Sequence, residues 1–127
     1  RSQEFVIGGY TPGNPFDALI VGYYDGGRLK YVGKIRNGFV SHLRCAMMPL
    51  FEELLTDQCP FDDLPENRHT LYSLTRDEMA GCQWLKPLLV AQIEFAEWTP
   101  DGHLRHSSFA GLRNDKEALQ VSLEKTT

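Results

Sequence analysis

Residues 18–36 read ALIVGYYDGGRLKYVGKIR, and the rest of the architecture follows outward from them. Two runs rich in β-branched and aromatic residues flank Asp25-Gly26-Gly27, which is a tight-turn signal. The segment therefore predicts an antiparallel hairpin with strands over 18–24 and 28–36. Glycines interrupt both runs, which is typical of strands that bulge or bend sharply, as in small coiled barrels.

Strand signals continue on both sides of the hairpin. Residues 3–10 are rich in β-formers and end at the turn-forming cluster 11–15. Residues 88–98 alternate, and the turn 99–102 leads into a returning strand over 103–112. The apolar side of the first of these later strands consists of Leu89, Ala91, Ile93 and Phe95.

Helical signals are confined to three short segments. Apolar residues between Leu43 and Leu55 recur at helical spacing after Ser41, which we expect to cap that helix, and Pro49 must kink it or begin a second one. The capping-box pattern of residues 75–78 predicts another short helix. Asn114, with Glu117 three residues later, predicts a short C-terminal helix.

The expected order is three strands, a helical connection and two more strands. This order is typical of an all-β protein with a helical insertion, namely an OB-fold, a five-stranded, partly open Greek-key barrel with its helix between strands 3 and 4. A small α+β sheet with the helix on one face is the competing interpretation. A chain of 127 residues corresponds to a single domain, residues 1–127.

Composition excludes several other classes of protein. With 42% hydrophobic and 24% charged residues the chain is not a disordered one, and no apolar run approaches the roughly 20 residues that span a membrane. Three cysteines without a C-x-x-C pair argue against a disulfide framework or a zinc site, so we expect inert thiols in a reducing cytoplasm. The four histidines suggest no metal site. Because the chain begins at Arg1, we expect it to be a piece of a longer protein.

The net charge of −4 conceals a segregated distribution. Five cations and no acid lie between residues 26 and 51, whereas six acids and no base lie between 52 and 66. Four of the cations share one parity of the third strand and should project from one face, where they could follow the phosphates of a DNA duplex: Arg28, Lys30, Lys34 and Arg36. A solvated outer face is the alternative.

A second basic element lies near the C-terminus, over residues 105–116. Arg113 and Lys116 stand where a strand ends, a junction that suits a polyphosphate. The alternative is a surface turn in which Asp115 pairs with either cation. This segment resembles motif VI of the OB domain of ATP-dependent DNA ligases, with matches at Arg105, Phe109, Arg113, Asp115 and Lys116. It departs from that motif at His106 and Ser107, where many ligases carry Phe and Pro.

Blocks 3–10, 21–26 and 90–102 also resemble this domain, in the version found in bacterial ligase D of nonhomologous end joining. The resemblance spans residues 3–120 and is weakest over 41–84. It implies an upstream nucleotidyltransferase domain, whose lysine in a Lys-x-Asp-Gly motif attacks ATP. That motif is absent here, so the isolated chain is not expected to ligate DNA.

The resemblance also implies roles for individual residues. Arg113 and Lys116 would orient the β- and γ-phosphates of ATP, with Asp115 auxiliary. The DNA contacts would be Arg28, Lys30, Lys34, Arg36 and Arg105. ATP and magnesium would serve the parent enzyme, with neither held by this domain alone. The expected partners are nicked or broken duplex DNA and the upstream domain, for a monomer at the bacterial nucleoid.

Two other functions stay open at this point. A free-standing OB module that binds single strands would stack bases on aromatic side chains such as Tyr23, Tyr24, Tyr31 and Trp98. A protein-interaction barrel would instead use the acidic stretch 52–66.

Overall fold

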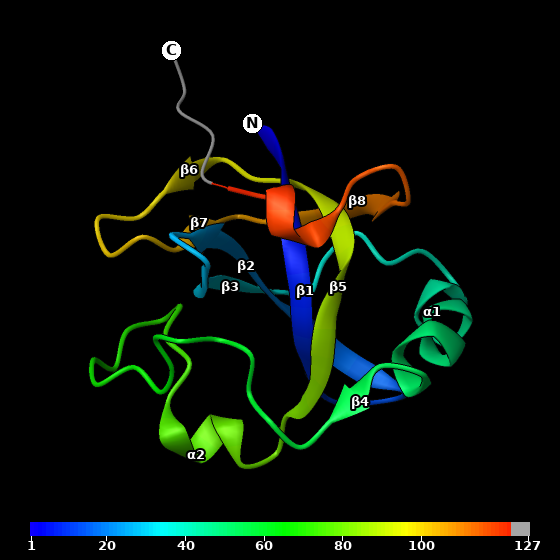
Figure 1. Ribbon diagram of the computed structural model, residues 1–127, viewed down its shortest axis with the longest axis horizontal. Coiled ribbons are helices and arrows are strands. Elements are labelled where there is room, and N and C mark those ends of the chain that lie inside the picture. Colours follow the sequence, from blue (N-terminus) through cyan, green and yellow to red (C-terminus); the bar gives the residue numbers. More distant parts are fainter. Residues whose placement is uncertain (123–127) are drawn as a thin grey trace.

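The expected hairpin is present in the computed structural model, which describes residues 1–122 (Figure 1). Its two strands come within a few residues of the predicted limits. In chain order the elements are β1 Ser2–Pro12, β2 Phe16–Asp25, β3 Arg28–Ile35, α1 Leu43–Glu52, β4 Leu55–Thr56, α2 Arg76–Met79, β5 Gln83–Glu94, β6 Glu97–Trp98, β7 Leu104–Arg105, β8 Ser108–Arg113 and the 3-10 helix η1 Ala118–Gln120.

The main sheet has the strand order β3-β2-β1-β5-β4, with β8 paired to the other part of β5, and every one of these pairings is antiparallel. The sheet curls until β8 approaches the end of β3, where the Phe109 N–H donates to the Asn37 carbonyl oxygen at 2.8 Å. The five long strands thus form a partly open barrel, with α1 between β3 and β4. This confirms the OB-fold with its helical insertion and rules out the α+β alternative.

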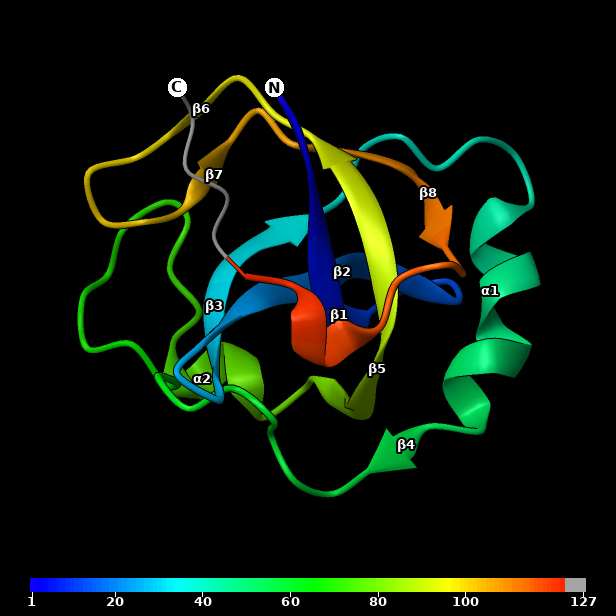
Figure 2. The same cartoon turned by 45° about the horizontal axis from the view of Figure 1, so that its top comes forward.

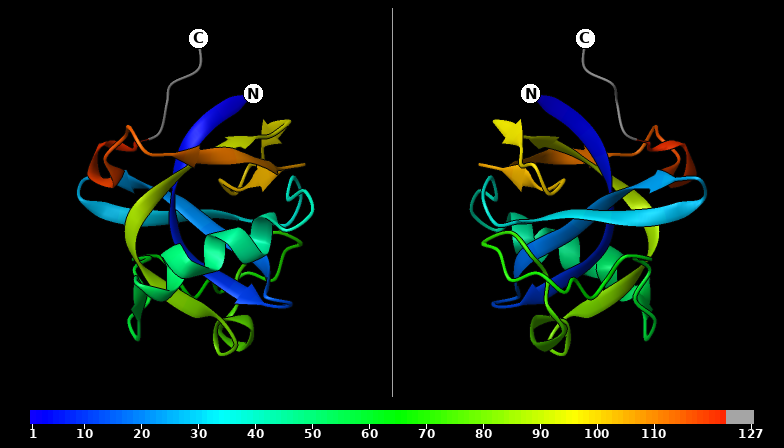
Figure 3. Two further views of the ribbon diagram at one scale, coloured as in Figure 1. Left: turned by 90° about the vertical axis from the view of Figure 1, so that its right-hand side faces the viewer. Right: turned by 90° about the vertical axis from the view of Figure 1, so that its left-hand side faces the viewer.

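The barrel interior holds the larger of two apolar clusters. Ala91, Ile93 and Phe95 are buried in it and Leu89 packs against it, so the predicted apolar side of β5 is confirmed, although β5 begins five residues earlier than expected. Met47 and Phe51 of α1 contribute to the same cluster. In the left view of Figure 3, α1 accordingly lies across the curved strands.

A second apolar cluster lies on the outer side of the sheet, where side chains of residues 57–82 pack against the strands. Figure 2 shows the backbone of this segment, drawn in green, passing beside β3. Phe61 packs directly on two paired strands, because Gly8 and Gly22 have no side chains. A Cβ atom at Gly8 would lie 2.4 Å from the Phe61 ring, and one at Gly22 would lie 2.8 Å from it. The acidic stretch 52–66 therefore contributes an aromatic anchor to the fold.

Strand β3 contains a bulge that reverses the side-chain alternation. Gly22 pairs with Tyr31 and Val21 with Gly33, so Val32 is an extra residue. Before the bulge, Leu29 and Tyr31 face the outer cluster. Strict alternation would place Ile35 on the same side, but it faces the barrel interior. The predicted single face bearing Arg28, Lys30, Lys34 and Arg36 is therefore wrong, because one inserted residue exchanges the two sides of a strand.

The helix ends differ from expectation in two of three cases. The capping box at Thr75 is confirmed, and α2 follows it. Ser41 does not cap α1, which starts after His42 (φ 67°) and continues through Pro49. The terminal helix is a single 3-10 turn preceded by Glu117 rather than a helix capped by Asn114.

The returning strand expected over 103–112 is divided into β7 and β8 around His106, which has a φ of 56°.

Within residues 1–122, none of the helices combines the length and the apolar character needed to cross a bilayer.

Replacing Phe61 with alanine should lower the free energy of unfolding by about 3–5 kcal/mol, because it leaves a cavity where the ring packed between the outer segment and strands β1 and β2. Urea denaturation of wild type and variant measures this difference. Leu71→Ala is the control, since that side chain is 82% exposed, and it should leave stability unchanged. Equal stability of F61A and wild type would contradict the anchoring role of Phe61.

Candidate functional site

Two cations at the end of β8 converge on one carboxylate of β1. The Lys116 Nζ lies 3.3 Å from Oε1 of Glu4, and Nη1 of Arg113 lies 3.4 Å from Oε2 of the same residue. Both cationic side chains are partly exposed, whereas the Glu4 side chain is only 13% exposed. Glu4 thus lies between the two residues expected to contact phosphate, although 112 positions separate it from Lys116.

Arg113 has two further acceptors. Its Nε and Nη2 donate to the two carboxylate oxygens of Asp115 at 3.0 Å each, and its Nη1 donates to Oε1 of Gln92 on β5 at 3.0 Å. The hydrogen bond and the charge of Asp115 raise the pKa of Arg113, and the same hydrogen bond lowers the pKa of Asp115. The pairing of Arg113 with Asp115, expected in the surface-turn alternative, is therefore present.

This cluster can accept an anion in two ways. Lys116 has three N–H donors and is partly exposed, so incoming phosphate oxygens can bind it beside Glu4. For Arg113, a phosphate would take the place of Asp115, whose side chain is 71% exposed and offers the same planar two-oxygen geometry. Because water screens an exposed ion pair, exchanging Asp115 for a phosphate costs Arg113 little.

The four cations of the β3 segment all have acidic partners that come from other parts of the chain. Arg28 and Lys30 approach Oδ2 of Asp62 at 3.3 and 3.6 Å. Arg36 lies 2.8 Å from Asp17 on β2. The cations of the β3 segment are therefore all paired, although β3 itself contains no acidic residue.

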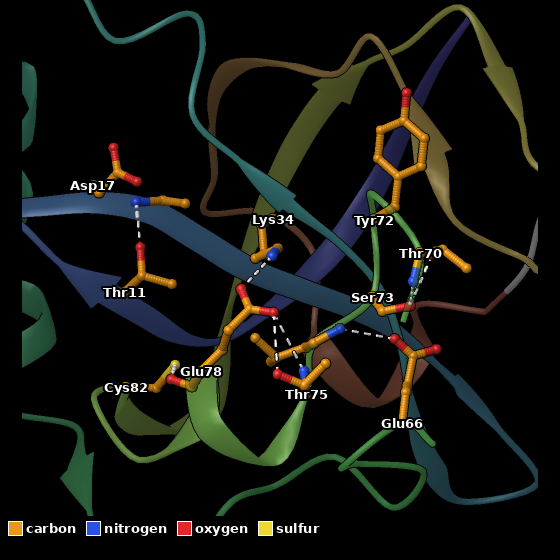
Figure 4. Close-up of polar contacts among 12 residues, drawn as sticks. Thr11, Asp17, Lys34, Glu66, Thr70, Tyr72, Ser73, Thr75, Glu78 and Cys82 are labelled. Atoms are coloured by element: carbon orange, nitrogen blue, oxygen red, sulfur yellow. Dashed lines mark hydrogen bonds and ion pairs between the residues drawn. The ribbon is translucent and has the colours of Figure 1, made fainter. Parts of the chain in front are cut away.

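Lys34 lies under α2 rather than in solvent. Its Nζ is 2.6 Å from Oε2 of Glu78, and only 8% of its side chain is exposed (Figure 4). Burial alone raises the pKa of Glu78, but the hydrogen bond and the charge of Lys34, together with the hydrogen bonds of Thr75, outweigh burial and lower it. The expectation of an exposed cation at Lys34 is wrong, because the bulge at Val32 turns it toward the outer cluster.

Arg36 and Arg105 approach neighbouring parts of the surface. Arg36 lines a hollow of about 270 Å³ with Tyr72 and His106. Arg105 lines an adjoining hollow of about 470 Å³ that also includes Tyr72 and His106. Arg105 pairs across the β6–β7 ribbon with Glu97 at 2.9 Å, and the pair is exposed. Neither hollow includes Arg113 or Lys116, so these two residues lie apart from Arg36 and Arg105.

The aromatic residues considered for single-strand binding do not form a stacking surface. Tyr31 is buried and its hydroxyl donates to the Tyr72 carbonyl oxygen at 2.9 Å. Trp98 packs edge-on against Phe5 and Phe95 in the barrel cluster. Tyr23 and Tyr24 are also packed against the apolar clusters. These four side chains are therefore used in the fold.

Half of the six acids between residues 52 and 66 have intramolecular partners. Asp62 pairs with Arg28, and Asp63 accepts the Tyr31 N–H at 3.0 Å. Glu66 accepts the Leu74 N–H and lies 2.8 Å from Nε2 of His103. This stretch consequently braces the outer layer, which weakens the protein-interaction alternative.

Sequence reasoning missed several polar residues that the structure places in contacts. Glu4 and Gln92 face each other across β1 and β5, but no local pattern marks either residue as a partner of Arg113. His103, for which the sequence shows no functional partner, is buried against Glu66.

Burial raises the pKa of Cys82 to about 11, which agrees with an inert thiol. Within residues 1–122, no three His, Cys, Asp or Glu side chains are arranged to hold a metal ion.

A known protein family matches most of the chain. Residues 12–116 match the family described as the ATP dependent DNA ligase C terminal region. The chain is 33% identical to the multifunctional non-homologous end joining protein LigD of Mycobacterium bovis, and 32% identical to the protein of that name from Pseudomonas aeruginosa. These alignments cover 98% and 97% of the chain but only 16% and 14% of the relatives.

Two solved structures are similar over almost the whole chain. The ligase domain of Mycobacterium tuberculosis LigD matches with a TM-score of 0.83 and 34% identity, covering 98% of this chain and 39% of that one. A mycobacterial DNA ligase D complexed with ATP and MES matches with a TM-score of 0.82 and 35% identity, covering 98% and 38%.

Glu78→Gln should lower the free energy of unfolding at pH 7 by about 1–2 kcal/mol, because the buried ammonium of Lys34 loses its counter-charge while Glu78 itself stays partly exposed. The lowered pKa of Glu78 means that its contribution to stability is present above the unfolded-state pKa near 4.5 and disappears as the pH falls through the folded-state pKa. Urea denaturation from pH 7 to pH 3 should therefore show the two proteins converging in acid. A constant difference across that range would contradict this assignment.

Proposed function

The chain belongs to the ATP dependent DNA ligase C terminal region family, and on that basis we propose that it is the OB domain of a bacterial DNA ligase of the end-joining type. In this proposal the domain orients the triphosphate of ATP in one step and binds duplex DNA around a nick in another. The observation that supports it most directly is the convergence of Arg113 and Lys116 at the end of β8, within the segment that matches the family.

The first role concerns adenylylation of a lysine in another domain. The lysine attacks the α-phosphate, and the leaving pyrophosphate gains negative charge as its bond to that phosphate breaks. Lys116 supplies a compact charge for the β- and γ-phosphate oxygens, whereas Arg113 supplies a planar fork. Cations held in place before the reaction stabilise this developing charge without reorganising. Asp115 assists by orienting the guanidinium of Arg113 until phosphate arrives.

The nucleophile and the metal are assigned to the parent enzyme. This chain contains no Lys-x-Asp-Gly motif, so the lysine would belong to a nucleotidyltransferase domain in the rest of the protein. Magnesium would accompany ATP in that enzyme and shield the charge of its phosphates. None of the steps assigned to residues 1–122 requires this chain to hold the ion.

The second role is contact with the DNA backbone. Arg28, Arg36 and Arg105 have exposed side chains in exposed ion pairs, so they can exchange a carboxylate for a phosphate at little cost. Lys30 is a further candidate, while the burial of Lys34 argues for a structural role there. Contacts to phosphates position a protein without reading sequence, which suits an enzyme that must seal any nick.

The remaining parts of the proposal concern context. The partners are nicked or broken duplex DNA and the nucleotidyltransferase domain of the same protein. Since the chain spans about a sixth of the LigD relatives, we infer a monomeric multidomain parent acting on DNA in the bacterial cytoplasm.

Arg113→Ala and Lys116→Ala in the parent ligase should each slow lysine adenylylation by about 100-fold or more, because each removes a donor that stabilises the leaving pyrophosphate. Sealing of a nick that already carries AMP should change much less, since no pyrophosphate leaves in that reaction. Single-turnover assays of the two steps measure the difference. Equal slowing of both steps would contradict the phosphate role.

Reversal of the charge of Arg36, or of Arg105, by a single substitution to glutamate should weaken binding to nicked duplex. It should also flatten the salt dependence of binding, by about one unit of slope for each phosphate that the protein no longer neutralises. Fluorescence anisotropy at several salt concentrations measures both effects. Lys34→Glu is unsuitable as a comparison, because it would place a carboxylate at a buried position beside Glu78. Arg76→Glu on α2 is the matched control and should leave the slope unaltered; an equal change there would assign the effect to net charge alone.

A further inference from the structure

Glu4 occupies a position where a carboxylate requires an explanation. It lies on β1 directly opposite Gln92 of β5, with its side chain almost entirely covered. Its Oε1 accepts a hydrogen bond from Lys116, while its Oε2 is buried, accepts no hydrogen bond from residues 1–122 and lies 3.4 Å from Nη1 of Arg113. Removing a carboxylate from water is costly unless nearby cations compensate, so Glu4 depends on both of them.

The dependence also runs in the opposite direction. Lys116 and Arg113 are long, flexible side chains of like charge, and on their own they would repel each other and sample many rotamers. Glu4 lies between them on a strand of the barrel wall, and Gln92 on the neighbouring strand holds the same Nη1 of Arg113. The rigid sheet thereby determines where the side chain of Arg113, at the end of β8, and that of Lys116, in the segment after β8, can lie.

The two carboxylates of the cluster differ in how easily a ligand can replace them. Asp115 is largely exposed and follows Arg113 closely in the chain, so a phosphate can displace it. Glu4 is shielded from solvent and belongs to the sheet, so it remains in contact with the cations when the phosphate binds. The ends of Lys116 and Arg113 that Glu4 does not occupy are then left for the ligand.

We propose that Glu4 is a positioning residue for lysine adenylylation. From its place on β1 it holds the side chains of Lys116 and Arg113 so that both can contact the departing pyrophosphate. This inference rests on the function proposed above and adds a residue outside the segment 12–116 that matches the family. Glu4 touches neither ATP nor DNA in this proposal. Its effect on the reaction passes entirely through the two cations.

The test compares Glu4→Gln, Glu4→Asp and Glu94→Gln in the full ligase polypeptide that contains this chain. Glu4→Gln keeps the shape of the side chain but removes its charge, so adenylylation at saturating ATP should slow by roughly 10- to 100-fold through misplaced cations. Glu4→Asp keeps the charge and should recover part of the rate. Glu94→Gln is the matched control, since Glu94 is an exposed residue on β5, and it should have no effect.

Two further measurements separate positioning from a purely structural role. Sealing of a pre-adenylylated nick should proceed at the wild-type rate in Glu4→Gln, which also shows that the variant is folded. In a Lys116→Ala, Arg113→Ala background, Glu4→Gln should cause no additional slowing, because the groups through which it acts are gone.

The contrary outcomes are distinct. Faster adenylylation by Glu4→Gln would show that Glu4 competes with ATP for the cations, and equal loss of both steps would show a folding role; either result overturns the inference. If Arg113→Ala and Lys116→Ala slow adenylylation but Glu4→Gln does not, the inference fails while the proposed function stands. If those two variants have no effect on adenylylation, the proposed function itself fails.

Discussion

The contact between the Phe61 ring and the backbone of two paired strands is the constraint on which the outer half of the molecule depends. Gly8 and Gly22 permit this contact because neither has a Cβ atom, and a methyl group at either position would overlap the ring. With Phe61 in place, residues 57–82 cover the outer side of β1, β2 and β3. That cover accounts for the buried hydroxyl of Tyr31, the buried ammonium of Lys34 that pairs with Glu78, and the contact between His103 and Glu66.

The outer layer also limits where function can reside. An OB barrel that binds single strands uses the outer face of its central strands, and in this chain apolar packing occupies that face. The cations that stay accessible lie at its margins: Arg28 at the β2–β3 turn, Arg36 and Arg105 around two adjoining hollows, and Arg113 with Lys116 at and just after the end of β8. Separate basic groups of this kind fit an enzyme part that uses one surface for the nucleotide and another for the duplex.

The sequence predicted the fold more completely than the site. Alternation along β5 and the turn at Asp25-Gly26-Gly27 are local patterns, and the structure confirms both. The single cationic face of β3 failed because one bulged residue, Val32, reverses alternation, and no pattern in the sequence marks which residue bulges. Glu4 was missed for a related reason: an isolated carboxylate near the start of a strand has no visible partner until β8 lies alongside β5.

By itself, the sequence determined the hairpin, the helical insertion, the capping box at Thr75 and the pair of cations at Arg113 and Lys116, because each of these depends on residues within a few positions of one another. Only the tertiary structure decided which cations remain exposed and which acids meet them. Ion pairs form between side chains that folding brings together across dozens of positions, as with Lys34 and Glu78 or Glu4 and Lys116. The order of charges along a chain does not say which oppositely charged side chains will be close in space. Local hydrogen bonding and side-chain periodicity, in contrast, depend only on neighbouring residues.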